Sequence, residues 1–158
     1  MTSRLDLGAT APLGMKPLLD LTRYVNGCGL EHPLLELVKL RASYMNGCAY
    51  CVDMHTKDAR ADGETEQRIY AVPVWRETPF FSPRERAALA WTEAVTELGP
   101  HGVPDEVYAE ASAHFPPKEL ADLTLAVISI NAWNRVAVPF RAPVGSYKAG
   151  SVRKSLEV

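Results

Sequence analysis

Apolar and polar residues alternate along most of the chain at the spacing of amphipathic helices, and strand patterns are sparse. The clearest case is residues 82–98, "SPRERAALAWTEAVTEL", where Ser82 suits the N-cap and Pro83 the first helical position. Glu85 completes an S-x-x-E capping box, and a Gly-Pro pair follows the segment. These signals predict a helix with well-defined ends.

The remaining segments carry weaker forms of this pattern. Residues 117–138 form an apolar run that is rich in β-branched residues but too long for one strand, so we expect a buried helix. Further helices are expected at 16–25, 33–46, 48–62, 64–75 and 104–114, with Pro73 bending or ending the fourth of them. The pattern as a whole predicts an all-α fold, a compact bundle of about six helices.

The periodic pattern ends near Phe140. Residues 141–158, "RAPVGSYKAGSVRKSLEV", contain glycines, a proline and scattered charges but no periodic apolar face. A chain of 158 residues is long enough for one domain with a substantial core. We therefore expect one domain over residues 1–140, followed by an arm or a mobile tail over 141–158.

Composition narrows the classes of partner. Apolar residues make up 47% of the chain, and the net charge is only −2, which gives no electrostatic reason to bind nucleic acid or an anionic membrane. The N-terminus lacks the pattern of a signal peptide, and no apolar run approaches the roughly 18 residues of a membrane span. We expect a cytoplasmic protein, where a CxxC pair is more often catalytic or metal-binding than structural.

That CxxC pair lies in the stretch "NGCAYCVDMH", residues 46–55. If the Asn-Gly pair breaks the chain and a helix begins near Cys48, then Cys48, Cys51 and His55 fall within about 60° of one another. The helix start stabilises a thiolate at Cys48, while His55 lies one turn from Cys51 and can take its proton. Each effect favours the reactive thiolate form of one cysteine, so residue spacing alone leaves open which sulfur attacks first.

Three other interpretations use the same residues. Structural zinc needs four ligands, so Cys28, His32 or His114 would have to complete the set. In the second interpretation the two cysteines are an inert buried pair. In the third they form an inert structural disulfide, which a cytoplasmic setting disfavours.

Glu36 is the candidate for a relay carboxylate. If residues 33–46 and 48–62 form a hairpin folded at Gly47, Glu36 is offset from the level of His55 by about 4 to 5 Å and from Cys51 by about 10 Å. The order would then be Glu36, His55, Cys51. The alternative is that Glu36 belongs to a solvated stripe with Lys39 and Ser43 and pairs with Lys39 at i, i+3.

Together, Glu36, Cys48, Cys51 and His55 form the pattern E-x₁₁-C-x-x-C-x₃-H, which resembles AhpD-like alkylhydroperoxidases of the carboxymuconolactone decarboxylase superfamily. The resemblance is closest over residues 33–98. It implies an all-α fold that assembles into homo-oligomers, often trimers or hexamers. It also implies that Cys51 attacks the hydroperoxide, that Cys48 resolves the sulfenic acid to a disulfide, and that His55 and Glu36 relay protons.

In that family the disulfide is reduced by an external dithiol, such as a lipoyl-bearing protein; a thioredoxin-like donor is the other expectation.

One position departs from the family pattern, because Tyr50 stands where a second histidine precedes the second cysteine. A phenol with a pKa near 10 donates a hydrogen bond but does not carry protons near pH 7, so Tyr50 is at most an auxiliary residue. The CxxC pair argues against lactone decarboxylation, because decarboxylase members typically lack it.

We therefore expect a thiol-dependent hydroperoxide reductase or disulfide oxidoreductase that needs no metal or organic cofactor and acts on an organic hydroperoxide. The alternative is a non-catalytic module that senses redox state or binds zinc with the same face. Core or subunit packing is expected for most of the large aromatic residues, and lining a substrate pocket is the alternative; the residues concerned are Tyr50, Trp75, Phe80, Phe81 and Trp133. Asn131 and Asn134 interrupt an apolar helix and suggest buried hydrogen bonds.

Overall fold

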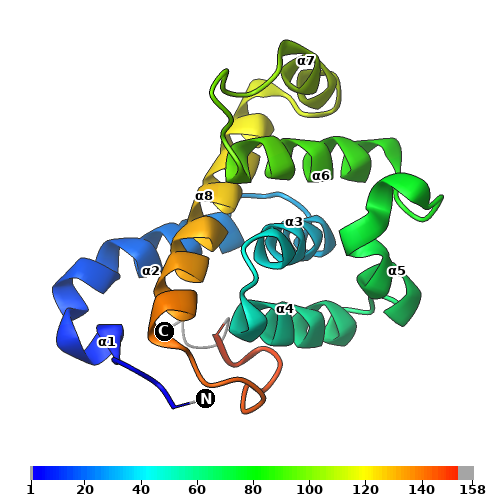
Figure 1. Ribbon diagram of the computed structural model, residues 1–158. Coiled ribbons are helices and arrows are strands. Elements are labelled where there is room, and N and C mark those ends of the chain that lie inside the picture. The colour runs from blue at the N-terminus through cyan, green and yellow to red at the C-terminus, as the bar shows by residue number, and fades with distance from the viewer. Residues whose placement is uncertain (1, 153–158) are drawn as a thin grey trace.

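The computed structural model describes residues 2–152, and within these residues it contains helices and no β-strand (Figure 1). The all-α fold class is therefore confirmed, although the described chain has eight α-helices where about six were expected. The helices are α1 (Leu7–Thr10), α2 (Pro12–Asn26), α3 (His32–Met45), α4 (Ala49–Ala61), α5 (Glu66–Ala71), the 3₁₀-helix η1 (Val72–Glu77), α6 (Pro83–Thr96), α7 (Asp105–His114) and α8 (Pro117–Phe140).

Two segments differ from the expected elements. The short helix α1 was not anticipated; the side chain of Asp6 caps it by accepting a hydrogen bond of 3.0 Å from the Ala9 amide. The single helix expected over 64–75 is divided into α5 and η1. Pro73 lacks the amide proton that would continue the α-helical ladder, and Val74 next to it has non-helical dihedrals.

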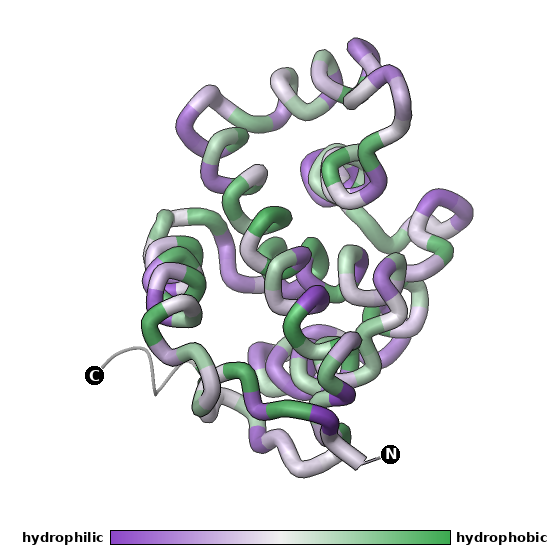
Figure 2. Tube along the Cα trace, turned by 60° about the vertical axis from the view of Figure 1, so that its left-hand side comes forward, coloured by the Kyte–Doolittle hydropathy of each residue, from purple (hydrophilic) through white to green (hydrophobic). Residues whose placement is uncertain are grey.

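The central element is α3, which packs against α4, α6 and α8 (Figure 1). Helix α2 lies against α8, and α7 packs against α6. Figure 2 shows apolar and polar residues interleaved within individual helices, as expected for helices that bury one face. Because α3 has neighbours on three sides, most of its residues are buried, including the polar Glu36 and Ser43.

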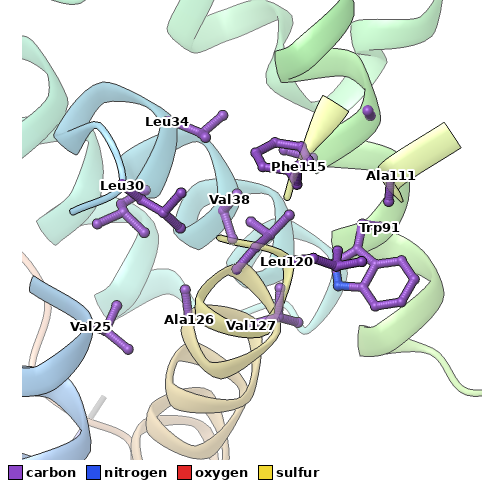
Figure 3. Packing of buried hydrophobic residues seen from close by; sticks show 14 residues of the cluster. Val25, Leu30, Leu34, Val38, Trp91, Ala111, Phe115, Leu120, Ala126 and Val127 are labelled. Carbon is purple, nitrogen blue, oxygen red and sulfur yellow. The ribbon is translucent and has the colours of Figure 1, made fainter. Parts of the chain in front are cut away.

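Most of the core lies where α3, α6, α7 and α8 meet. Figure 3 shows Val38 of α3, Trp91 of α6 and Val127 of α8 among the apolar side chains that converge there, together with Phe115 at the C-terminal end of α7. A second apolar cluster lies under α5 and η1 and contains Trp75 and Phe81. A third, smaller cluster joins α4 to α8 and is made of Ala42, Cys48, Cys51, Ile130 and Ala137. The two cysteines are therefore part of a packed helix interface.

Helix α8 is long and apolar enough, by length and composition alone, to cross a membrane. Its place in the fold accounts for that composition, because it packs against α2, α3 and α6 and buries Leu123 and Val127 completely. A core helix of this kind meets the same length and composition criteria as a membrane span. The cytoplasmic location stays a prediction.

After α8 the chain turns at Arg141, whose φ of 54° is left-handed, and runs back along α4. We call residues 141–152 the C-terminal arm. The Gly145 amide donates to Asp53 at 3.2 Å, and the Lys57 ammonium donates to the carbonyl oxygens of Gly145 and Tyr147 at 3.3 and 3.2 Å. These contacts hold the arm against α4. Residues 153–158 of the expected tail lie outside the described residues.

Candidate active site

The turn between α3 and α4 places the cysteines. Gly47 has a φ of +63°, a left-handed conformation that glycine adopts without the steric cost of a Cβ atom. The Cys48 amide then donates to the carbonyl oxygen of Ser43 at 2.9 Å, which closes the end of α3. Helix α4 begins at Ala49 with Cys48 as its N-cap. The Asn-Gly pair thus produces the break and the helix start that its sequence predicts.

Asn46 ties this turn to α8. Its side-chain amide donates to the Oδ1 atoms of Asn131 and Asn134 at 3.0 and 2.9 Å. Asn134 in turn donates to the Ser43 hydroxyl at 3.2 Å. The buried hydrogen bonding expected from the sequence is confirmed for Asn134, whereas Asn131 forms its hydrogen bonds in a half-buried position. The role of Asn46 as their partner was missed, since a turn signal says nothing about which distant helix the side chain reaches.

Cys48 and Cys51 are joined by a disulfide, and both are 1% exposed. The Cys51 amide donates to the Cys48 sulfur at 3.3 Å, so this sulfur occupies the N-cap position of α4. Unpaired amides at a helix start stabilise negative charge. In the reduced protein, the same position favours a Cys48 thiolate.

His55 and Glu36 form a buried pair. Nδ1 of His55 lies 2.8 Å from Oε2 of Glu36, and the two residues are 6% and 3% exposed. The hairpin folded at Gly47 therefore brings Glu36 to the level of His55, as the residue count predicts. With Nδ1 facing a carboxylate, Nε2 is the ring nitrogen available for proton exchange.

Lys39 completes this group, with its ammonium 3.0 Å from Oε1 of Glu36 and 3.3 Å from Oδ1 of Asn26. The i, i+3 pair considered from the sequence therefore exists, but the idea of a solvated stripe is wrong, because α3 buries Glu36 and Ser43. Burial alone would raise the pKa of Glu36, but the charges of Lys39 and His55 outweigh it and hold that pKa well below its ordinary value. Glu36 is a carboxylate at neutral pH.

A pocket of about 280 Å³ opens beside this group. Cys51, His55, Glu36 and Lys39 line it, whereas Cys48 does not. The rest of the lining is largely apolar and comes from α2, α4, α8 and the C-terminal arm: Leu19, Thr22, Asn26, Tyr50, Met54, Asp58, Ser129, Ile130, Trp133, Ala137 and Val152. The pocket therefore gives one of the two sulfur atoms contact with a space suited to a small, mostly apolar molecule.

The aromatic residues considered for a pocket divide into two groups. Tyr50 and Trp133 line it, and the Trp133 indole donates to the Thr22 hydroxyl at 2.8 Å, which fixes the ring. Trp75, Phe80 and Phe81 pack in the cluster under α5 and η1, which is the core packing expected for most of these residues, and do not line the pocket. Aromatic character alone does not show which face of the bundle a side chain joins.

Sequence reasoning missed Asp58, which is buried and lines the pocket one turn after His55. Potential metal-ligand atoms of Glu36, His55 and Asp58 all lie within 4.8 Å of one another. Both carboxylates already accept hydrogen bonds from protein donors, however, and Lys39 supplies a positive charge at Glu36. The sequence did contain a signal for Asp58, because the spacing of Cys51, His55 and Asp58 places all three on one face of a helix.

The zinc alternative needed a fourth ligand from Cys28, His32 or His114. Within residues 2–152, none of these three belongs to a group of three metal-ligating side chains, and Cys28 packs against the main apolar cluster. The two motif cysteines are bonded to each other. The described part of the chain thus shows no closed four-ligand zinc site.

Comparison with known proteins gives a consistent result. Residues 13–94 match the family model described as the carboxymuconolactone decarboxylase family. A Bacillus subtilis (strain 168) relative, the uncharacterized protein YdfG, is 44% identical over 138 residues, which cover 87% of this chain and 94% of the relative.

Two solved structures extend the comparison. One is a protein of unknown function from Agrobacterium tumefaciens, provisionally described as the antioxidant defence protein AhpD; it is 43% identical with a TM-score of 0.89, covering 92% of this chain and 100% of that one. The other is an uncharacterized peroxidase-related protein with an alkylhydroperoxidase AhpD core from Ralstonia eutropha JMP134, 20% identical with a TM-score of 0.75. The match covers 88% of this chain and 74% of the Ralstonia protein, and at that identity it concerns the fold alone.

Proposed function

Because this chain belongs to the carboxymuconolactone decarboxylase family and has an AhpD-like fold, we propose that it is a thiol-dependent reductase of organic hydroperoxides. The catalytic group is Cys51 and Cys48 with His55 and Glu36, and no metal or organic cofactor takes part. The observation that carries the proposal is the shared pocket: Cys51 lines the same cavity as His55 and Glu36, and Cys48, which does not line it, is bonded to Cys51.

The first step is attack by the Cys51 thiolate on the terminal peroxide oxygen. The S–O bond forms as the O–O bond breaks, the alkoxide leaves, and Cys51 becomes a sulfenic acid. Cys48 then attacks the Cys51 sulfur as a thiolate. The S–O bond breaks, and the leaving hydroxide takes up the proton that the Cys48 thiol gave up and departs as water, which leaves the disulfide that the structure contains. An external dithiol reduces this disulfide by thiol–disulfide exchange and is itself oxidised, so each hydroperoxide consumes two electrons from that donor.

His55 is the proton carrier. Nε2 takes the proton from the Cys51 thiol, and the resulting imidazolium returns it to the alkoxide as the alcohol leaves. Glu36 holds the ring through Nδ1 and stabilises the imidazolium charge. Lys39 limits this stabilisation, because it already neutralises part of the Glu36 charge. Two positive groups thus share one carboxylate, which favours the return of the proton.

Tyr50 takes the place of the second family histidine and lines the pocket. Its hydroxyl is suited to orienting a peroxide by a hydrogen bond, while proton transfer depends on the single His55–Glu36 pair. We therefore propose slower turnover than a protein with two histidines would have.

The proposed partners follow from the chemistry. A dithiol carrier, lipoyl-bearing or thioredoxin-like, reduces the disulfide, and the chain forms a homo-oligomer, a trimer or a hexamer. Exposed apolar side chains on α2 and α8 support self-association, with Leu13 86% exposed and Ile128 and Val138 about half exposed.

Steady-state turnover tests the proposal against a redox sensor that only toggles its disulfide. The reduced, metal-free protein is mixed with cumene hydroperoxide and dihydrolipoamide, and alcohol formed per protein is counted. Many turnovers are expected for wild type and for Cys28→Ser, and loss of turnover for Cys51→Ser, Cys48→Ser and His55→Ala. One equivalent of alcohol per protein, with no further turnover, would favour the sensor.

A further inference from the structure

The C-terminal arm is part of the pocket wall. Val152 from the arm and Asp58 from α4 both line the cavity that contains Cys51. The cavity volume of about 280 Å³ is just below the usual range for small-molecule sites, about 300 to 1,000 Å³. The position of the arm therefore affects how much room remains beside the reactive sulfur.

Asp58 is the point at which the arm is attached. The Tyr147 hydroxyl donates to Oδ2 of Asp58 at 2.8 Å, and the Gly150 amide donates to Oδ1 at 2.8 Å. Hydrogen bonds to a buried carboxylate are stronger than those between neutral groups. Burial, and then the bond to Asp58, raise the pKa of Tyr147 to about 12, so its hydroxyl stays protonated and able to donate throughout the neutral range.

This attachment lies next to the reacting groups. Asp58 follows His55 by one helical turn, and its carboxylate is within 4.8 Å of ligand atoms of both His55 and Glu36. The other contacts of the arm, at Asp53 and Lys57, are on more exposed parts of α4. The bonds from Tyr147 and Gly150 to Asp58 are therefore the contacts that place the arm at the pocket itself, and the Tyr147 bond is the one that a side-chain substitution removes.

We propose that Tyr147 and Asp58 are specificity-determining residues, which hold the C-terminal arm as a fixed wall and restrict the pocket to compact hydroperoxides. The role of Tyr147 and Asp58 in selecting substrates rests on the proposed function, whereas their role in limiting access to the Cys51 sulfur does not. Removing the Tyr147 hydroxyl takes away one bond to a charged acceptor and shifts the arm toward open positions about tenfold. Bulky reagents gain access, while small ones already have it.

Thiol labelling tests the access step without any peroxidase assay. In a Cys28→Ser, Cys48→Ser background only Cys51 reacts, and its rate is measured with N-methylmaleimide and with N-(1-pyrenyl)maleimide, which share one reactive group but differ in size. Tyr147→Phe and a deletion of residues 145–158 are compared with Tyr108→Phe, an exposed tyrosine on α7. Circular dichroism checks that each variant is folded.

Both changes to the arm are expected to raise the pyrenyl rate about tenfold and the methyl rate less than twofold, with no effect of Tyr108→Phe. Equal acceleration of both reagents, or no change with either, would overturn the proposal. Peroxidase turnover with tert-butyl hydroperoxide and with a bulky lipid hydroperoxide is measured on the same arm variants with all cysteines present. Size-selective labelling without turnover would support the arm as a fixed pocket wall and rule out the proposed function. Turnover without size-selective labelling would support the proposed function and rule out the fixed wall.

Discussion

Nδ1 of His55 lies 2.8 Å from Oε2 of Glu36, although 19 residues separate the two in sequence. The contact exists because α3 and α4 fold back on each other at Gly47 and because α3 is buried on several sides. A charged carboxylate in such a position fixes the orientation of the imidazole and the ring nitrogen that faces the pocket side. The first two predictions concern this pair.

Replacing Glu36 with glutamine keeps its shape and removes its charge. The imidazolium then loses its stabilising carboxylate, so we expect kcat/KM for cumene hydroperoxide to fall about 10²-fold, within the range of general acid–base effects. Glu110→Gln, on the exposed face of α7, is the matched control and should leave kcat/KM unchanged. A Glu36→Gln protein with wild-type kcat/KM would show that the pair has no role in proton transfer.

The same carboxylate should make stability depend on pH. Since the pKa of Glu36 is lower in the folded chain than its ordinary 4.5, the unfolded chain binds this proton more tightly. The stabilisation is fully present above about pH 4.5 and is lost as the pH falls toward the folded pKa, at up to about 1.4 kcal/mol per pH unit. Urea unfolding from pH 6 to pH 3 should show a shallower decline for Glu36→Gln. Parallel curves for the two proteins would contradict this assignment.

Asn46 should be important for stability. Asn46→Ala removes the donor shared by Asn131 and Asn134 and leaves their Oδ1 atoms without it, so we expect a loss of about 1–3 kcal/mol in the free energy of unfolding. A double-mutant cycle with Asn131→Ala measures the coupling. If the two losses simply add, the hydrogen bond between Asn46 and Asn131 contributes nothing.

A substitution at Gly47 tests how much the left-handed backbone conformation at the turn contributes to stability. A Cβ atom at this position meets nothing within 4 Å, so the cost of Gly47→Ala is that of the left-handed conformation alone, about 1–2 kcal/mol. Gly99 also has open space but no positive φ, which makes Gly99→Ala the matched control. Chemical denaturation should show a loss for the first variant and little change for the second; equal losses would mean that conformation at Gly47 is not the cause.

The local signals in the sequence predicted much of this structure. Ser82 and Glu85 form the capping box expected at the start of α6, and Gly47 breaks the chain between α3 and α4. Glu36 also meets His55, because two helices joined by a tight turn leave few arrangements. Each of these depends on residues close in sequence or on simple helix geometry.

Long-range packing explains what the sequence did not show. The attachment of the arm depends on Asp58 accepting from Tyr147, 89 residues away, and the segment that contains Tyr147 has no periodic pattern. Likewise, nothing near Trp75 or Phe81 indicates that they pack under α5 instead of beside Cys51. Such contacts depend on how the helices pack in three dimensions.

Trapping of the sulfenic acid shows whether Cys51 is the sulfur that attacks the peroxide, as proposed. Reduced Cys48→Ser and Cys51→Ser proteins, both also Cys28→Ser, are each treated with one equivalent of cumene hydroperoxide and dimedone, and the adduct is located by peptide mass spectrometry. We predict an adduct on Cys51 in the Cys48→Ser protein and none on Cys48 in the Cys51→Ser protein. An adduct on Cys48, with Cys51 unmodified, would contradict the account.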